Sequence, residues 1–278
     1  MDTSLLITLI LILISFIVSL FGSVVGFGGG IFMVPLLVTI FHFTLTQAVG
    51  AVMIALIPSS IISTYLNRKE GHVDFRMGVF LELPTMLGVV AGSLLLSFIS
   101  AKRLEVIFAI MVLFLGLSFL INFRKSGKGG IDIFYWLNKM KPRFIIKNQL
   151  NYVAYRVSIW MVLFLGMLAG TLAGLFGIGG GFLKTPIMIK VFKIPAKIAA
   201  ATGLFMIVIT SVTGSISHYL QGHIALSQSW PVMLGFATGA LAGQRLNVKL
   251  DSNSLENLIG LGLMLASLIM LSNFLLNL

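Results

Sequence analysis

The chain has 278 residues, of which 58% are hydrophobic and only 10% carry a charge. No soluble core of this length can bury so much apolar surface, so the composition excludes a soluble globular protein and makes the lipid bilayer the solvent. The formal net charge of +11 does not indicate nucleic-acid binding, because most of this net charge lies in one linker beside apolar stretches. The absence of cysteine excludes disulfides and thiolate chemistry.

The N-terminal stretch from Thr3 to Asn67 contains no Asp, Glu, Lys or Arg. As a helix it would extend roughly 98 Å, about three crossings of a hydrocarbon core of about 30 Å. The basic start of a cleavable signal peptide is missing, since Asp2 is the one charge before Arg68. We therefore expect the first segment to be a retained membrane helix.

Uncharged apolar segments continue along the chain and predict an all-α polytopic membrane protein. Two short apolar arms, at residues 30–41 and 181–192, follow glycine-rich runs. The predicted membrane helices are, in chain order, 3–25, 47–66, 77–99, 105–122, 157–176, 198–220, 229–246 and 255–277.

A basic linker separates two hydrophobic halves, which we predict to be a first transmembrane repeat (1–122) and a second one (157–278), with the linker at 123–156. Between residues 122 and 156 there are eight Lys and Arg against one Asp, a bias that marks the cytoplasmic side. Its aromatic residues favour a segment lying along the inner leaflet beside anionic lipid, and a solvated connector is the alternative.

The two halves are predicted to be an internal repeat. "GFGGGIFMVP" at 26–35 matches "GIGGGFLKTP" at 177–186, and "GHV" at 71–73 matches "GHI" at 222–224, both at an offset of 151 residues. At an offset of 147, "PTMLGVVAG" (84–92) matches "PVMLGFATG" (231–239). Chance agreement among apolar residues is frequent, whereas matched Gly, Pro and His in one order are not.

The count of Lys and Arg on each side favours five crossings per half. Both counts assume that the linker lies inside. If each arm is one crossing, each half has five crossings, and sixteen cations lie in the cytoplasm and three outside. If the arms do not cross, each half has four crossings, and the two sides hold eleven and eight cations. An odd number of crossings makes the halves inverted relative to each other.

Each glycine triplet breaks a helix inside an apolar stretch. Broken backbone survives in lipid only where protein encloses it or where it lines a cavity, and the freed N–H groups at a half-helix start favour anions. The two matched breaks therefore predict one central anion site, and tight helix packing is the alternative. The candidate residues are Gly28, Gly29, Gly30, Gly179, Gly180 and Gly181.

Polar side chains near the arms extend this candidate site. Lys184 lies three residues beyond a triplet with apolar half-helix on both sides, so it either adds charge to the site or reaches an interface. The first half has Met33 there. Glu82 is a candidate proton or cation site or simply a carboxylate near water. The hydroxyl candidates are Ser59, Ser60, Thr202 and Thr210, which bind an oxyanion or hold helices together.

Several functional classes lack the residues that they need. His72 and His223 occupy matching loop positions without a third ligand at metal spacing, so we predict no metal and no cofactor, and turn capping as their role. Neither glycine run has the Lys-Ser or Lys-Thr spacing of a P-loop, and no HExxH pattern is present. We therefore expect neither ATP-driven pumping nor an enzyme.

The duplicated "GxGGGxxxxP", the "GHV" and "GHI" pair and "GQRL" at 243–246 resemble the TauE/SafE family of membrane permeases, the sulfite exporters, over nearly the whole chain. The resemblance implies secondary transport of a sulfur-containing anion such as sulfite, thiosulfate or an organosulfonate across a prokaryotic plasma membrane. Family members are usually drawn with seven to nine helices. The expected partners are the anion, membrane lipids and a coupling proton or ion. Association into a homodimer is left as an alternative to a monomer. An anion channel and a membrane enzyme or assembly factor for lipid-linked substrates are the alternative functions.

Overall fold

The computed structural model describes residues 3–96, 143–148 and 153–247, together with single residues and short groups within 98–117 and 254–268. The predicted helices at 105–122 and 255–277 and most of the linker at 123–156 lie largely outside the described residues.

The described part is mostly helical, as predicted, and the helix ends lie within four residues of the expected ones. In chain order the elements are α1 (Thr3–Val25), α2 (Gly30–Thr39), α3 (Leu45–Lys69), α4 (Phe75–Leu95), α7 (Ile159–Phe176), α8 (Gly181–Lys190), α9 (Ala196–Leu220) and α10 (Leu226–Asn247). Among the described residues, α1, α3, α4, α7 and α9 are long and apolar enough to cross a membrane.

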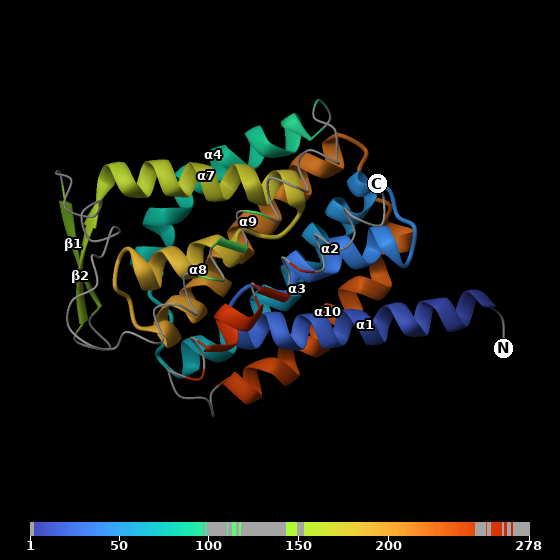
Figure 1. Cartoon of the computed structure of the whole chain (residues 1–278), viewed down its shortest axis with the longest axis horizontal. Helices are drawn as coiled ribbons and strands as arrows, with labels where there is room; N and C mark the ends of the chain where they lie inside the picture. Colours follow the sequence, from blue (N-terminus) through green and yellow to red (C-terminus); the bar gives the residue numbers. More distant parts are fainter. Residues whose placement is uncertain are drawn as a thin grey trace.

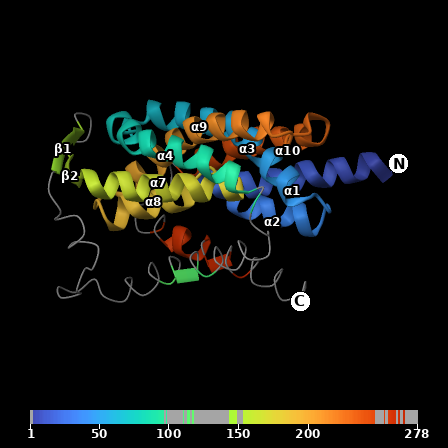
Figure 2. The same cartoon turned by 90° about the horizontal axis from the view of Figure 1, so that it is seen from above.

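The linker contributes a β-hairpin that the sequence analysis did not predict. Strands β1 (Arg143–Asn148) and β2 (Val153–Ser158) pair antiparallel, with Arg143 opposite Ser158 and Asn148 opposite Val153. The hairpin leads into α7 and lies at one end of the helical body, while the N-terminus lies at the opposite end (Figures 1 and 2).

Local capping fixes the starts of two helices. The Thr44 hydroxyl accepts a hydrogen bond from the Gln47 N–H, and the Gln47 side chain accepts one from the Thr44 N–H, which starts α3 at Leu45. The Asp74 carboxylate accepts from the Met77 N–H at 3.0 Å and starts α4. These caps stabilise the first turns of α3 and α4, which both lie around the centre of the protein.

Glycines allow two helix pairs to approach until their backbones touch. A Cβ added to Gly88 would lie 2.3 Å from the Met167 oxygen of α7, and one added to Gly239 would lie 2.3 Å from the Phe16 oxygen of α1. No side chain fits at such a distance, so these glycines serve packing, as their four-residue spacing indicates.

These contacts place α4 and α10 in correspondence at an offset of 151 residues. Gly88 and Gly239 are 151 residues apart, and so are the residues that they touch, Phe16 and Met167. The sequence match of 84–92 with 231–239 has an offset of 147. It therefore pairs residues that are shifted by about one helical turn from the residues that make equivalent contacts in the structure. Glycines repeat every four residues in both helices, which lets a sequence match slip by that amount.

The helix directions follow from successive contacts. Along α10, glycines 235, 239 and 243 meet residues 12, 16 and 20 of α1, so these two helices run parallel. Along α7, glycines 166, 170 and 174 meet residues 81, 85 and 89 of α4, which are also parallel. Since α3 and α4 are joined by a short loop, α1, α3 and α10 run in one direction and α4, α7 and α9 in the other. The first helices of the two halves, α1 and α7, therefore run in opposite directions (Figure 1).

The short arm α2 reverses the chain. Met33 lies back against α1, with its sulfur 3.8 Å from the Ser15 hydroxyl, while α3 again runs parallel to α1, as the Ser19–Ser59 and Ser23–Ser63 hydroxyl pairs show. Ten helical residues extend about 15 Å, half of the hydrocarbon core. The arm with its following loop thus returns the chain to the side where α1 began, although the helix itself spans only half the thickness.

Candidate functional site

The glycine runs end one helix and start the next at equivalent places. α1 ends at Val25 and α2 begins at Gly30, and α7 ends at Phe176 and α8 begins at Gly181. The glycines between them, 26, 28 and 29 in the first run and 177, 179 and 180 in the second, have positive φ angles from 64° to 95°. Residues with a side chain adopt this left-handed backbone at a cost, which explains the glycine at each position.

The two breaks touch each other at the centre of the protein. A Cβ on Gly30 would lie 2.8 Å from the Ile178 Cα, and one on Gly181 would lie 3.0 Å from the Gly26 oxygen. Leu56, midway along α3, and Ile207, midway along α9, close the contact from both sides. The glycines therefore serve tight packing, and they place the starts of α2 and α8 beside the middles of α3 and α9.

Beside the second break, Lys184 forms a buried ion pair with Glu82. The Lys184 Nζ donates to Glu82 Oε2 at 2.7 Å and to the Thr210 Oγ1 at 2.5 Å, and the Thr210 hydroxyl donates to Glu82 Oε1. Lys184 and Glu82 are each 1% exposed. Three elements that are far apart in the sequence, α4, α8 and α9, thus bring one cation, one carboxylate and one hydroxyl together.

Glycine at position 180 lets the lysine fold back along its own helix start. The Lys184 N–H donates to the Gly180 oxygen at 3.0 Å, in the first turn of α8. A Cβ on Gly180 would lie 3.0 Å from Lys184 Cε and 3.4 Å from its Nζ. The ammonium group therefore lies next to the helix N-terminus, so the positive end of the helix dipole adds to its charge.

Of the hydroxyl candidates from the sequence, Thr210 is the one that meets Lys184. The Ser59 hydroxyl lies 3.4 Å from that of Ser19, Ser60 donates to the Leu56 oxygen of its own helix, and Thr202 accepts from the Asp74 N–H at 2.9 Å. The sequence analysis gave Glu82 less weight than Lys184 as a functional residue. The signal that pointed to Glu82 was a carboxylate inside the predicted apolar helix 77–99.

The equivalent place, at the first glycine break, is uncharged. At the offset of 151 residues that relates the helix contacts, Lys184 corresponds to Met33 and Thr210 to Ser59, and Met233 stands where Glu82 would be. Met33 is fully buried, with the Ser15 hydroxyl as its polar neighbour. The buried charges are thus confined to one of the two places.

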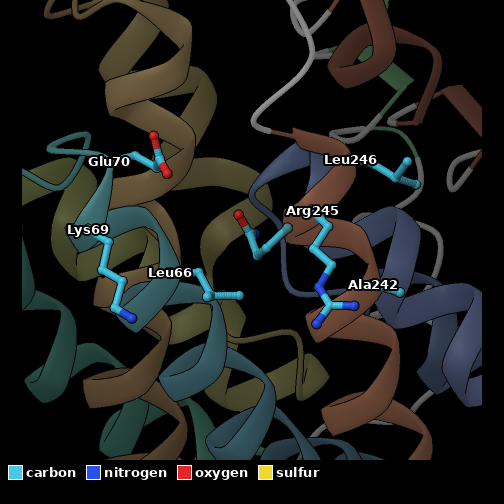
Figure 3. A pocket seen from close by; sticks show the side chains of 7 residues that line it. Leu66, Lys69, Glu70, Ala242, Arg245 and Leu246 are labelled. Atoms are coloured by element: carbon cyan, nitrogen blue, oxygen red, sulfur yellow. The ribbon is translucent and has the colours of Figure 1, made fainter.

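Hydrogen-bonded side chains line the α1–α3–α10 interface from its middle to the end where the hairpin lies. The Asn67 amide donates to Gln244 Oε1 at 2.6 Å and to the Ser63 oxygen at 2.8 Å, and Gln244 donates to the Ser23 oxygen at 2.7 Å. Gln244 also lines an open pocket between the ends of α3 and α10, where Lys69 and Arg245 lie on opposite walls (Figure 3). The pocket is lined by Leu66, Lys69, Glu70, Ala242, Gln244, Arg245 and Leu246.

The opposite end of the protein holds a histidine pair. His218 and His223 approach to 3.1 Å between their Nδ1 atoms, and the His218 Nε2 lies 3.0 Å from the Gly174 oxygen. Burial lowers the pKa of the His223 imidazole. The His223 N–H also donates to the His218 oxygen and closes the turn after α9, as the His72 N–H does with the Asn67 oxygen after α3. Within the described ranges, no three His, Cys, Asp or Glu side chains gather as a metal site would require.

Comparison with known proteins decides the family. The sequence model of the sulfite exporter TauE/SafE family matches residues 11–270, nearly the whole chain. The chain belongs to the TauE/SafE family. Its long apolar helices make it a multi-pass membrane protein, and its bacterial relatives indicate the plasma membrane.

Individual relatives of this TauE/SafE protein carry transporter names. It is 30% identical over 256 residues to the probable membrane transporter protein YunE of Bacillus subtilis, covering 87% of this chain and 88% of that protein. It is 26% identical over 270 residues to a probable membrane transporter protein of Methanocaldococcus jannaschii, covering 90% and 92%. A sulfite exporter TauE/SafE family protein 1 of Arabidopsis thaliana is 40% identical over 70 residues, 25% of this chain and 15% of that protein. No solved structure matches the chain.

Proposed function

We propose that this TauE/SafE protein is a secondary transporter of a small sulfur-containing anion such as sulfite, thiosulfate or an organosulfonate, and that Lys184 binds the anion. The observation that carries the proposal is the buried lysine at the start of α8, paired with Glu82 and Thr210 beside Gly180. An ionisable residue buried inside a membrane protein is costly and marks substrate or ion pathways.

The chemistry of this cluster suits an oxyanion. A sulfonate or sulfite presents three oxygens that accept hydrogen bonds from the Lys184 ammonium, the Thr210 hydroxyl and the N–H groups of the first turn of α8. Gly180 leaves the backbone uncovered on the side where the lysine lies. An anion that binds there competes with Glu82 for the same cation.

The arrangement of the helices supports alternating access. We propose that the two halves are inverted repeats, because α1 and α7 run in opposite directions and the glycine contacts correspond at one offset. The two breaks meet between α3 and α9, where movement of one half against the other exposes the cluster to each side in turn. The cation-lined pocket at the ends of α3 and α10 is suited to attract anions on the linker side.

A carrier fits the buried cluster better than the anion channel that shares these parts. Both charges are 1% exposed and in contact with each other, which is a closed site. A carrier gives flux that saturates with anion concentration and shows counterflow, and a channel gives neither.

A ligand screen by thermal melting tests the proposed substrate class. We expect sulfite, thiosulfate, sulfoacetate or taurine to raise the melting temperature of the purified protein by about 5 °C at a concentration of about 100 times its Kd. Acetate and succinate serve as carboxylate controls. A protein that melts cooperatively and responds to none of the four sulfur compounds would contradict the proposal.

Two single cysteines in this cysteine-free chain test the inverted arrangement. Gly71 and Gly222 follow α3 and α9 at equivalent positions, with φ angles of 71° and 73° and open space around both. We expect Gly71→Cys to react with an impermeant thiol reagent only from the cytoplasmic side, and Gly222→Cys only from outside. Labelling of both from the same side would show parallel halves and rule out the proposed rocking of inverted repeats.

A further inference from the structure

We propose that Glu82 is the binding site of a coupling proton, so that each anion bound at Lys184 is accompanied by the uptake of one proton. The inference rests on the proposed anion site and adds the co-transported ion and its stoichiometry.

The first argument is that Glu82 and the anion use the same hydrogen-bond donors. Lys184 has three N–H bonds, of which one is directed to Glu82 and one to Thr210. Both carboxylate oxygens of Glu82 are engaged, Oε2 by Lys184 and Oε1 by the Thr210 hydroxyl. An oxyanion held by both the Lys184 ammonium and the Thr210 hydroxyl, as proposed above, takes these donors from Glu82.

The second argument is the charge that would remain. A carboxylate that loses its cationic partner in a site 1% exposed is strongly destabilised, and such groups take up a proton and become neutral. A hydrogen ion from water then forms an O–H bond at one carboxylate oxygen of Glu82, and no bond in the anion is broken. A monovalent anion and its proton therefore enter the site together without net charge.

The third argument is that the described helices around Glu82 bring no competing charged group to it. In the sequence, α7 has no Asp, Glu, Lys, Arg or His, and α9 has none between Lys197 and His218, two turns beyond Thr210. On α4 the other charged residues, Asp74 and Arg76, stand at the helix start, eight and six positions before Glu82. Lys184 is thus the charged group that faces Glu82 from the helices packed around it.

The fourth argument concerns stoichiometry. At the equivalent place, 151 residues away along the chain, Met33 and Met233 stand where Lys184 and Glu82 would be, so that place supplies neither a cation nor a carboxylate. Among the described residues, Glu82 is the carboxylate that contacts Lys184, which sets one proton per anion.

Calorimetry on the purified full-length protein tests this count. The probes are thiosulfate and methanesulfonate, because both stay fully ionised near neutral pH and release no proton of their own. Titrations in two buffers with different heats of ionisation give the number of protons taken up per anion bound. We expect one proton per anion for the wild type, and anion binding without proton uptake for Glu82→Gln. The control is Glu70→Gln, a matched carboxylate change in the loop after α3, for which we expect one proton per anion.

The outcomes separate the two proposals. Anion binding without proton uptake by the wild type overturns the proton site and leaves the anion site intact, and so does an uptake of one proton by Glu82→Gln. If Glu82→Gln fails to fold, the wild-type count decides, and the double variant Glu82→Gln with Lys184→Met, which removes both charges, should fold and bind no anion. A folded wild type that binds neither probe nor any other sulfur anion overturns the proposed function itself.

Discussion

Replacing Lys184 by methionine is expected to lower the apparent affinity for the anion by tenfold or more. Methionine has a similar length and is the residue that the first half carries at Met33, so the change removes the charge and little volume. A tenfold loss corresponds to only about 1.4 kcal/mol, less than a charge-assisted hydrogen bond to a buried ammonium group contributes. Uptake of radiolabelled thiosulfate or sulfonate by vesicles measures it.

The same substitution leaves Glu82 buried without its partner, which costs about 3–5 kcal/mol of folding free energy. A second change, Glu82→Gln, should restore the melting temperature without restoring transport, because it removes the unpaired charge but supplies no cation. Lys190→Met, at the far end of the same helix α8, is the control for loss of a lysine. An affinity unchanged by Lys184→Met would show that the lysine has a structural role alone.

Gly180→Ala is expected to reduce transport at least tenfold while the protein still folds. The added Cβ would lie 3.0 Å from Lys184 Cε and 3.4 Å from its Nζ, so the lysine side chain has to shift by a few tenths of an ångström, and we expect this shift to disturb its contacts with Glu82 and Thr210. The left-handed backbone, with a φ of 71°, adds a cost of roughly 1–2 kcal/mol.

Gly222→Ala separates these two effects. Gly222 has nearly the same φ, 73°, and no atom within 4 Å of an added Cβ, so alanine there brings the backbone strain without the contact. We expect both variants to lose a similar amount of thermal stability and only Gly180→Ala to lose transport. Equal transport by the two variants would mean that the position of Lys184 beside Gly180 does not matter for function.

Local patterns in the sequence were sufficient for the helices and their breaks. The starts of α2 and α8 depend on glycines that tolerate positive φ, and these effects act within a few residues. The β-hairpin was missed, because its strands lie in a linker whose aromatic and basic residues also suit a membrane surface.

The partner of Lys184 depended on long-range packing and could not be read from the sequence. Glu82 is 102 residues away in the chain, and the face that it presents is set by the glycine contacts between α4 and α7. Ser60 and Thr210 are both hydroxyl residues that donate to a carbonyl of their own helix, yet only Thr210 also meets Lys184 and Glu82, and the sequence does not tell the two apart.

The charge difference between the two equivalent places has an energetic consequence for the proposed carrier when it is empty. Two identical inverted halves would give inward-open and outward-open states of equal energy, because exchanging the halves converts one state into the other. Here Lys184 and Glu82 stand at one of the two equivalent places, with one residue from each half, and Met33 and Met233 stand at the other. In the proposed carrier, hydration of the ion pair then differs between the two states, so we expect an unloaded molecule to rest facing one side of the membrane. We expect its affinity for the anion, measured from the two sides, to differ accordingly.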